Sequence, residues 1–121
     1  MINLTVKDLE AALEVCENSI PCRGALKETA PGNKNAYCVM GCVIAGAARN
    51  RKKAFDAING MFSYESLGDQ FGDLVDQNDS KPSVGGGRFF ANPGAVKQWQ
   101  MGAIRKMIKK AEQNGGSIKA E

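Results

Sequence analysis

The 121-residue sequence contains no histidine. This absence excludes Ser-His-Asp and Cys-His nucleophilic pairs, acid–base catalysis by an imidazole, and zinc sites with histidine ligands. Cofactor motifs are missing as well, because the glycine run Gly85–Gly87 before Arg88 matches neither the Walker pattern nor the dinucleotide fingerprint. A flexible surface loop is a simpler interpretation of that run than a phosphate cradle. We therefore expect a protein that is not an enzyme and that holds no cofactor.

Long apolar segments are also missing. No apolar run reaches about 18 residues, and Lys7, Asp8 and Glu10 interrupt the first apolar positions, so neither a membrane-spanning helix nor a signal segment is indicated. We expect a cytoplasmic protein that does not bind a membrane. A chain of this length with 43% hydrophobic residues can bury one core without cross-links, which predicts a single domain over residues 1–121.

The longest apolar run is Ala36–Ala48, which has polar or charged residues on both sides. As a helix it would span roughly 20 Å, too short for a bilayer, so it predicts a central helix buried in the core. Asn35 is placed to cap this helix, and no Gly or Pro follows Arg49 before Asn59-Gly60 ends it. Small residues recur along it at helical spacing and allow a second helix to pack closely, in the rows Cys38, Cys42, Ala45 and Gly41, Ala45, Ala48.

Amphipathic periodicity predicts three further helices. Thr5 and Asp8 resemble a capping box that begins the first helix, which ends near Asn18. Another begins at Ser63 or Ser66, and the last runs from Asn92-Pro93 to Asn114-Gly115. The second of these helices carries its apolar positions at i, i+4, i+7 and i+8, namely Leu67, Phe71, Leu74 and Val75.

The segments between these helices contain the turn-forming residues. Residues 19–35 are expected to form a structured loop, and residues 78–92 a flexible Gly-rich loop with a short hairpin around Gly85–Phe90. Almost no alternating strand pattern occurs in the chain. We therefore predict an all-α fold, a small bundle of four to five helices with one irregular loop.

Four cysteines leave two interpretations open. In an exported chain they would suggest disulfides, but without an export signal we expect free buried thiols, with a four-thiolate zinc site as the alternative. Cys38 lies near a helix N-terminus, where peptide dipoles favour a thiolate, but no histidine is present to serve as its partner in catalysis. The four residues are Cys16, Cys22, Cys38 and Cys42.

Charge is distributed unevenly along the chain, although the net charge is only +3. The acidic residues of the middle segment fall at helical spacing, which indicates a solvated helix face more simply than a magnesium site or an acid–base pair; they are Asp69, Asp73, Asp76 and Asp79. Two basic clusters, 49–53 and 105–110, suggest nucleic-acid binding as an alternative function. Their cationic members are Arg49, Arg51, Lys52, Lys53, Arg105, Lys106, Lys109 and Lys110.

One stretch has the composition of an interface anchor. Arg88, Phe89 and Phe90 place a cation beside two rings, and two adjacent aromatics cannot both point inward from a regular element. We predict that Arg88 and a phenylalanine bind a partner, with Arg105 and Lys109 as charged support. In the alternative interpretation both phenylalanines close the bottom of the core.

Three short motifs also suggest a relationship. Cys22–Leu26, Tyr37–Cys42 and Val75–Asp79, which follow a Leu/Ala-rich first helix, resemble a family of small uncharacterised domains of bacteria and their phages. The chain lacks the tryptophan expected near Pro21, and it inserts the Gly-rich loop after Asn78-Asp79. The resemblance implies helical architecture and a phage or mobile-element accessory protein, and it implies no activity.

These features together predict a non-enzymatic accessory protein that binds stoichiometrically to a host or partner protein. Small size, the absence of histidine and of cofactor motifs, and the uneven charge favour this function. Nucleic-acid binding through the two basic clusters and a zinc-stabilised domain with four cysteine ligands are the alternatives.

Overall fold

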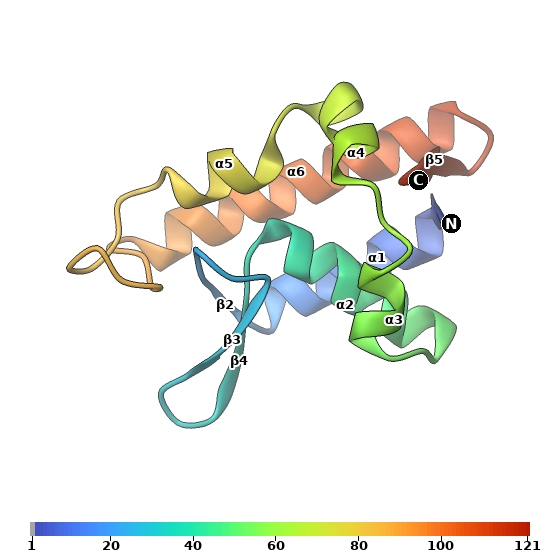
Figure 1. Cartoon of the computed structure of the whole chain (residues 1–121). Coiled ribbons are helices and arrows are strands. Elements are labelled where there is room, and N and C mark those ends of the chain that lie inside the picture. Colours follow the sequence, from blue (N-terminus) through green and yellow to red (C-terminus); the bar gives the residue numbers. More distant parts are fainter. Residues whose placement is uncertain (1) are drawn as a thin grey trace.

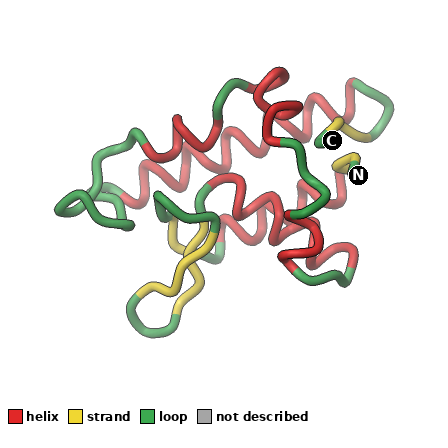
Figure 2. Tube along the Cα trace, viewed as in Figure 1, coloured by secondary structure: helices red, strands yellow, loops and turns green. Residues whose placement is uncertain are grey.

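The structure, a computed structural model, describes residues 2–121. Helix α6 runs along the length of the molecule, with α4 and α5 beside it and α1, α2 and α3 in the lower layer of Figure 1. The two chain ends lie next to each other, and the β3–β4 hairpin projects from the body (Figures 1 and 2). The elements are β1 (Asn3–Thr5), α1 (Val6–Glu17), β2 (Ile20–Pro21), β3 (Lys27–Ala30), β4 (Lys34–Tyr37), α2 (Val39–Arg51), α3 (Phe55–Asn59), α4 (Tyr64–Phe71), α5 (Leu74–Asp79), α6 (Pro93–Gln113) and β5 (Ser117–Lys119).

The all-α prediction is wrong, because the chain also forms two small sheets. Strands β1 and β5 pair antiparallel, which joins the two ends of the chain, and β4 lies between β2 (parallel) and β3 (antiparallel). These strands are two to four residues long. Alternation cannot be recognised over so few residues, and the partner of β1 is more than 100 residues away. The result is a mixed α/β fold, not a helical bundle.

The central helix is confirmed as a buried element, but its ends differ from the prediction. Ala36 and Tyr37 belong to β4, and Cys38, not Asn35, is the N-cap of α2. At the other end Lys52 adopts the left-handed conformation (φ 56°, ψ 47°), and the Lys53 N–H donates to the Ala48 carbonyl (2.9 Å). This backbone turn ends α2 without a glycine, so residues 55–59 form a separate helix, α3.

The predicted helix through Leu67 and Val75 is two helices in the structure. Gly72 has a positive φ of 81°, which L side chains rarely adopt, and it ends α4. Asp73 then caps α5, its carboxylate accepting a hydrogen bond from the Asp76 N–H (2.9 Å). The chain therefore turns between α4 and α5, where a single amphipathic helix was expected.

The other helix signals are confirmed. Thr5 and Asp8 form a capping box at the start of α1, and Ser63 caps α4. Asn92 caps α6 with Pro93 in its first turn. None of the helices within residues 2–121 is long and apolar enough to cross a membrane.

The backbones of α1 and α2 come into very close contact in the core. A Cβ on Gly46 would lie 2.2 Å from the Ala12 nitrogen, so only glycine allows the two backbones to come this close. Gly41 has the same role against the segment between β2 and β3, where a Cβ would lie 1.8 Å from the Leu26 carbonyl oxygen. The small-residue character of α2 therefore predicts close packing correctly, and the closest approach to the α1 backbone is made by Gly46, which lies outside the two predicted rows.

Candidate functional site

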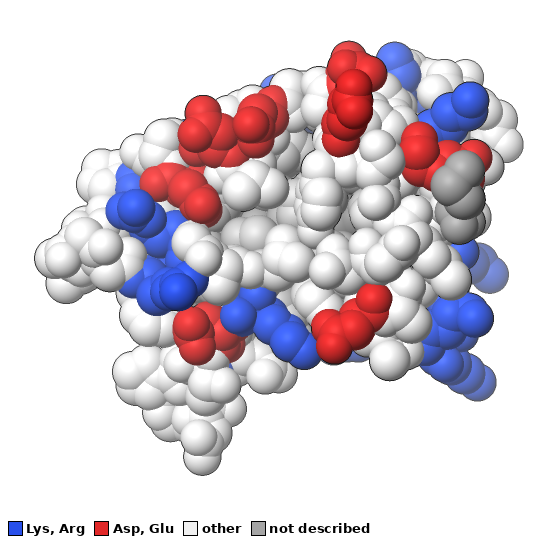
Figure 3. All heavy atoms as spheres, viewed as in Figure 1, with Lys and Arg blue, Asp and Glu red and all other residues white. Residues whose placement is uncertain are grey.

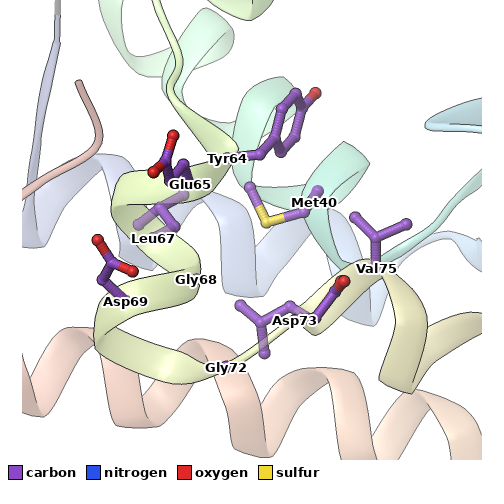
Figure 4. A pocket seen from close by; sticks show the side chains of 10 residues that line it. Met40, Tyr64, Glu65, Leu67, Gly68, Asp69, Gly72, Asp73 and Val75 are labelled. Atoms are coloured by element: carbon purple, nitrogen blue, oxygen red, sulfur yellow. The ribbon is translucent and has the colours of Figure 1, made fainter.

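A surface hollow of about 410 Å³ lies between α4 and α5 and is the candidate functional site. It exists because Gly72 ends α4 and the chain turns before α5 begins. Its floor includes Met40 from α2 and Leu67 (Figure 4), and Leu74 also lines the hollow. All three residues are buried in the core. The hollow is therefore preformed, because packed side chains fix its floor.

The rim of the hollow carries charge of one sign. Glu65 and Asp69 extend from one side of α4, and Asp73 stands at the opposite edge where α5 begins (Figure 4). No Lys or Arg is among the described residues that line the hollow. In Figure 3 acidic atoms lie over α4 and α5, and the surface between them and the lower layer is hollowed and uncharged.

Tyr64 stands at the mouth of the hollow, with its ring near the Met40 side chain (Figure 4). It is 42% exposed, and Val84 is the other large hydrophobic side chain that is exposed among residues 2–121. Its hydroxyl donates a hydrogen bond to Asn59 Oδ1 (2.7 Å), and burial raises the pKa of this phenol. The ring is therefore held in place, neutral, beside acidic side chains.

Gly68 forms part of the wall, in the middle of α4. A Cβ built on it has no neighbouring heavy atom within 4 Å, so the space in front of it is open. The missing side chain is not required by packing, in contrast to Gly46. A larger residue at position 68 would therefore project into open space without displacing the core.

A buried amide network holds α5 against the rest of the fold. Asn78 is fully buried, and its Oδ1 accepts hydrogen bonds from the Val39 N–H (3.1 Å) and Gln100 Nε2 (2.9 Å). Its Nδ2 donates to the Cys22 carbonyl (3.0 Å) and to Asp79 Oδ1 (2.9 Å). One side chain thus joins α5 to α2, α6 and the loop after β2, which positions the far wall of the hollow. The prediction had placed Asn78 in the flexible loop.

The four cysteines are free thiols, and their burial agrees with the expected hydrophobic role. Cys38 caps α2, its sulfur accepting a hydrogen bond from the Gly41 N–H (3.3 Å), but burial raises the pKa of this thiol where the sequence suggested a lowered one. Burial also raises the pKa of Cys22 to about 12. A hydrogen bond between Cys16 and Cys42 lowers the pKa of Cys16 and, with burial, raises that of Cys42.

The alternative of a four-thiolate zinc site gains no support from this arrangement. Over residues 2–121, no three or more His, Cys, Asp or Glu side chains converge in a way that would hold a metal ion. Cys16 donates to Gln100 Oε1 (3.3 Å), and Cys22 contacts the Ala25 carbonyl (3.8 Å). Asp73 and Asp79 of the acidic set take part in the hydrogen bonds described above.

The predicted partner-binding residues of the Gly-rich loop lie at the opposite end of α6 from the chain termini (Figure 1). Arg88 donates to the Gly24 carbonyl and lies 3.8 Å from the Glu28 carboxylate. Phe90 is only 3% exposed, and Phe89 is half-buried against a small cluster around Cys22. The described structure thus uses all three residues to hold the loop, and their binding role stays a prediction.

Arg105 and Lys109 are exposed on α6, but they lie more than three helical turns beyond its first residue, away from Arg88. Two cations of the basic cluster 49–53 form ion pairs within the chain, one with a buried carboxylate and one at the surface. Arg51 contacts the buried Asp8 carboxylate (2.7 Å), and Arg49 lies 3.8 Å from Glu14. The remaining cations of the two clusters are exposed.

Comparison of the chain with protein-family models, with curated proteins and with solved structures finds no match. The resemblance to a bacterial and phage family therefore stays a prediction. Function has to be inferred from the geometry of this chain. The sequence did not single out Tyr64, Glu65 and Gly68 of this hollow. Their only sequence signals were a glycine inside the predicted amphipathic helix and an aromatic residue directly after the helix cap Ser63.

Proposed function

We propose that the protein is a non-enzymatic module that binds a partner protein stoichiometrically through the hollow between α4 and α5. One observation supports this function most directly: a preformed apolar floor opens to solvent beside Tyr64, under a rim of charge of one sign. Exposed apolar surface with a polar rim is typical of protein interaction sites. Tyrosine is among the residues most enriched at the centre of such interfaces.

The chemistry of the hollow favours binding over catalysis. Among the residues that the structure describes, none in its lining is a cysteine, serine or lysine that a neighbouring base would activate as a nucleophile. At about 410 Å³ it lies at the small end of ligand pockets, which span about 300–1,000 Å³, and it is open on one side. Such a site takes one or two side chains of a partner, whose backbone makes further contacts around it.

Partner capture from a bacterial lysate at low salt tests this function. The wild-type chain should retain one protein at about one copy per chain, and Gly68→Leu, which fills the hollow, should lose it. Gly102→Leu is the matched control, because Gly102 lies on α6 and a Cβ there also has no neighbour within 4 Å. Turnover of a compound in a metabolite screen, with no protein retained, would contradict the proposal.

A further inference from the structure

We infer that the hollow binds an arginine or lysine side chain of the partner together with an apolar side chain next to it. This inference rests on the proposed function and adds the chemistry of the partner segment. Three features of the site determine it: the sign of the rim charge, the ring of Tyr64 and the apolar floor.

The rim charge favours a cation. Glu65, Asp69 and Asp73 lie on two sides of the hollow, and no cation among its described lining residues neutralises them. Within residues 2–121, neither Glu65 nor Asp69 forms an ion pair, and neither side chain accepts a hydrogen bond. A cation that enters the hollow therefore finds carboxylates that no group of residues 2–121 occupies.

The Tyr64 ring adds a second attraction of the same kind. A guanidinium or ammonium group over an aromatic face is attracted by the ring quadrupole. The hydrogen bond from the Tyr64 hydroxyl to Asn59 fixes the ring at the mouth, and its 42% exposure leaves ring surface for a partner. Arginine suits this combination best, since its planar group can stack on a ring and donate to two carboxylates.

The floor selects an apolar neighbour of that cation. Leu67 and Leu74 are packed in the core, and Met40 adds a thioether, which adapts to different apolar shapes. A free cation would leave this surface uncovered and would remain largely in water, because the hollow is open on the face seen in Figure 3. A protein segment that carries Arg beside Leu satisfies both the rim and the floor.

The test uses three fluorescein-labelled peptides with one Leu/Ala framework and a central Arg, Gln or Glu, measured by fluorescence polarisation. The Arg peptide should bind about tenfold more tightly than the Gln peptide, and the Glu peptide should bind most weakly. The advantage of Arg should shrink as salt rises from about 50 to about 500 mM. The double variant Glu65→Gln/Asp69→Asn should lose most of this advantage and still bind the Gln peptide, whereas the control Glu112→Gln on α6 should behave as wild type.

Several results would overturn the inference and leave the proposed function intact. They are equal affinity for the Arg and Gln peptides, equal affinity for free L-argininamide and the Arg peptide, or binding of no peptide while partner capture remains sensitive to Gly68→Leu. Self-association of the chain that disappears in the double variant would identify a second copy as the occupant and would also overturn it. If the wild-type chain neither binds any of the peptides nor captures a partner protein, the proposed function itself is contradicted.

Discussion

Gly46 in α2 and Gly68 in α4 have the same helical backbone and opposite surroundings. A Cβ at Gly46 would collide with the backbone of α1 at 2.2 Å, whereas a Cβ at Gly68 would find nothing within 4 Å. The missing side chain lets two helices touch in the first region and leaves a hollow open in the second. The comparison teaches that a glycine in a helix indicates a site only when the space in front of it is not required by packing.

The largest effect is expected from a substitution at Gly46, where α1 and α2 touch. Gly46→Ala should destabilise the fold by about 3 kcal/mol, because the new methyl group would meet backbone atoms of Ala12, which cannot move aside as a side chain can. The two helices would have to separate to admit it. Thermal unfolding should show a fall in Tm of about 10 °C. An unchanged Tm would mean that α1 and α2 are not in such close contact.

Asn78 links the two regions, because it joins the start of α2 to α5. Asn78→Ala should cost about 2–3 kcal/mol in urea unfolding, since the Val39 N–H and the Cys22 carbonyl lose a buried partner. It should also weaken binding of the Arg peptide, because α5 forms one wall of the hollow. Weakened stability with unchanged peptide affinity would show that the network does not position the site.

A smaller effect is expected at Asp8, which anchors α1 to Arg51 and does not line the hollow. Burial acts to raise the pKa of this carboxyl, but hydrogen bonds from Arg51, the Thr5 N–H and Asn50 outweigh it, so the folded-state pKa lies below the usual value. The ionised carboxylate therefore stabilises the fold above about pH 4, and this contribution is lost as pH falls through the folded-state pKa.

Asp8→Asn should accordingly lower the free energy of unfolding by about 1–2 kcal/mol at pH 7, and the gap from wild type should close toward pH 3. Urea unfolding at a series of pH values measures both quantities. Peptide affinity at pH 7 should not change. A gap that widens on acidification would reverse the assigned direction of the pKa shift.

The smallest effect has the opposite sign. Gly68→Ala should stabilise the chain by about 0.5–1 kcal/mol, because alanine favours the helix more than glycine and no atom blocks the methyl group. Thermal unfolding of Gly68→Ala and Gly46→Ala side by side would sharpen the contrast between the two regions. Destabilisation at position 68 would show that the hollow is filled in solution.

The sequence predicted the starts of α1, α4 and α6 correctly because capping residues act locally, whereas it placed the cap of α2 at Asn35 instead of Cys38. Thr5 with Asp8, Ser63 and Asn92-Pro93 each determine a terminus through neighbours within three residues. The strands could not be predicted in the same way, since β1 needs β5 at the other end of the chain. Likewise, nothing in the sequence indicates that Lys52 adopts the left-handed conformation and ends α2. The sequence also does not show that Gly72 ends a helix while Gly68 lies inside one, because only the backbone angles distinguish them.

The sequence did not point to the proposed site for a related reason. Composition directed attention to Arg88, Phe89 and Phe90, whose cation and rings resemble an interface anchor, but the fold uses them to close the Gly-rich loop. Tyr64 attracts no notice in the sequence and becomes prominent only when its exposure is compared with that of the other aromatics. The exposure of a side chain is a property of the packed structure, and residue type alone does not determine it.

Site-specific photo-crosslinking tests the central claim most directly. Tyr64 at the hollow and Val84 in the Gly-rich loop are the exposed large hydrophobic residues within 2–121. Each is replaced by benzoylphenylalanine in a separate variant, and both variants are irradiated in the same bacterial lysate. We expect one discrete adduct from position 64, its loss when Gly68→Leu is added, and no adduct from position 84. An adduct from position 84 with none from position 64 would contradict the claim and place the interface on the Gly-rich loop.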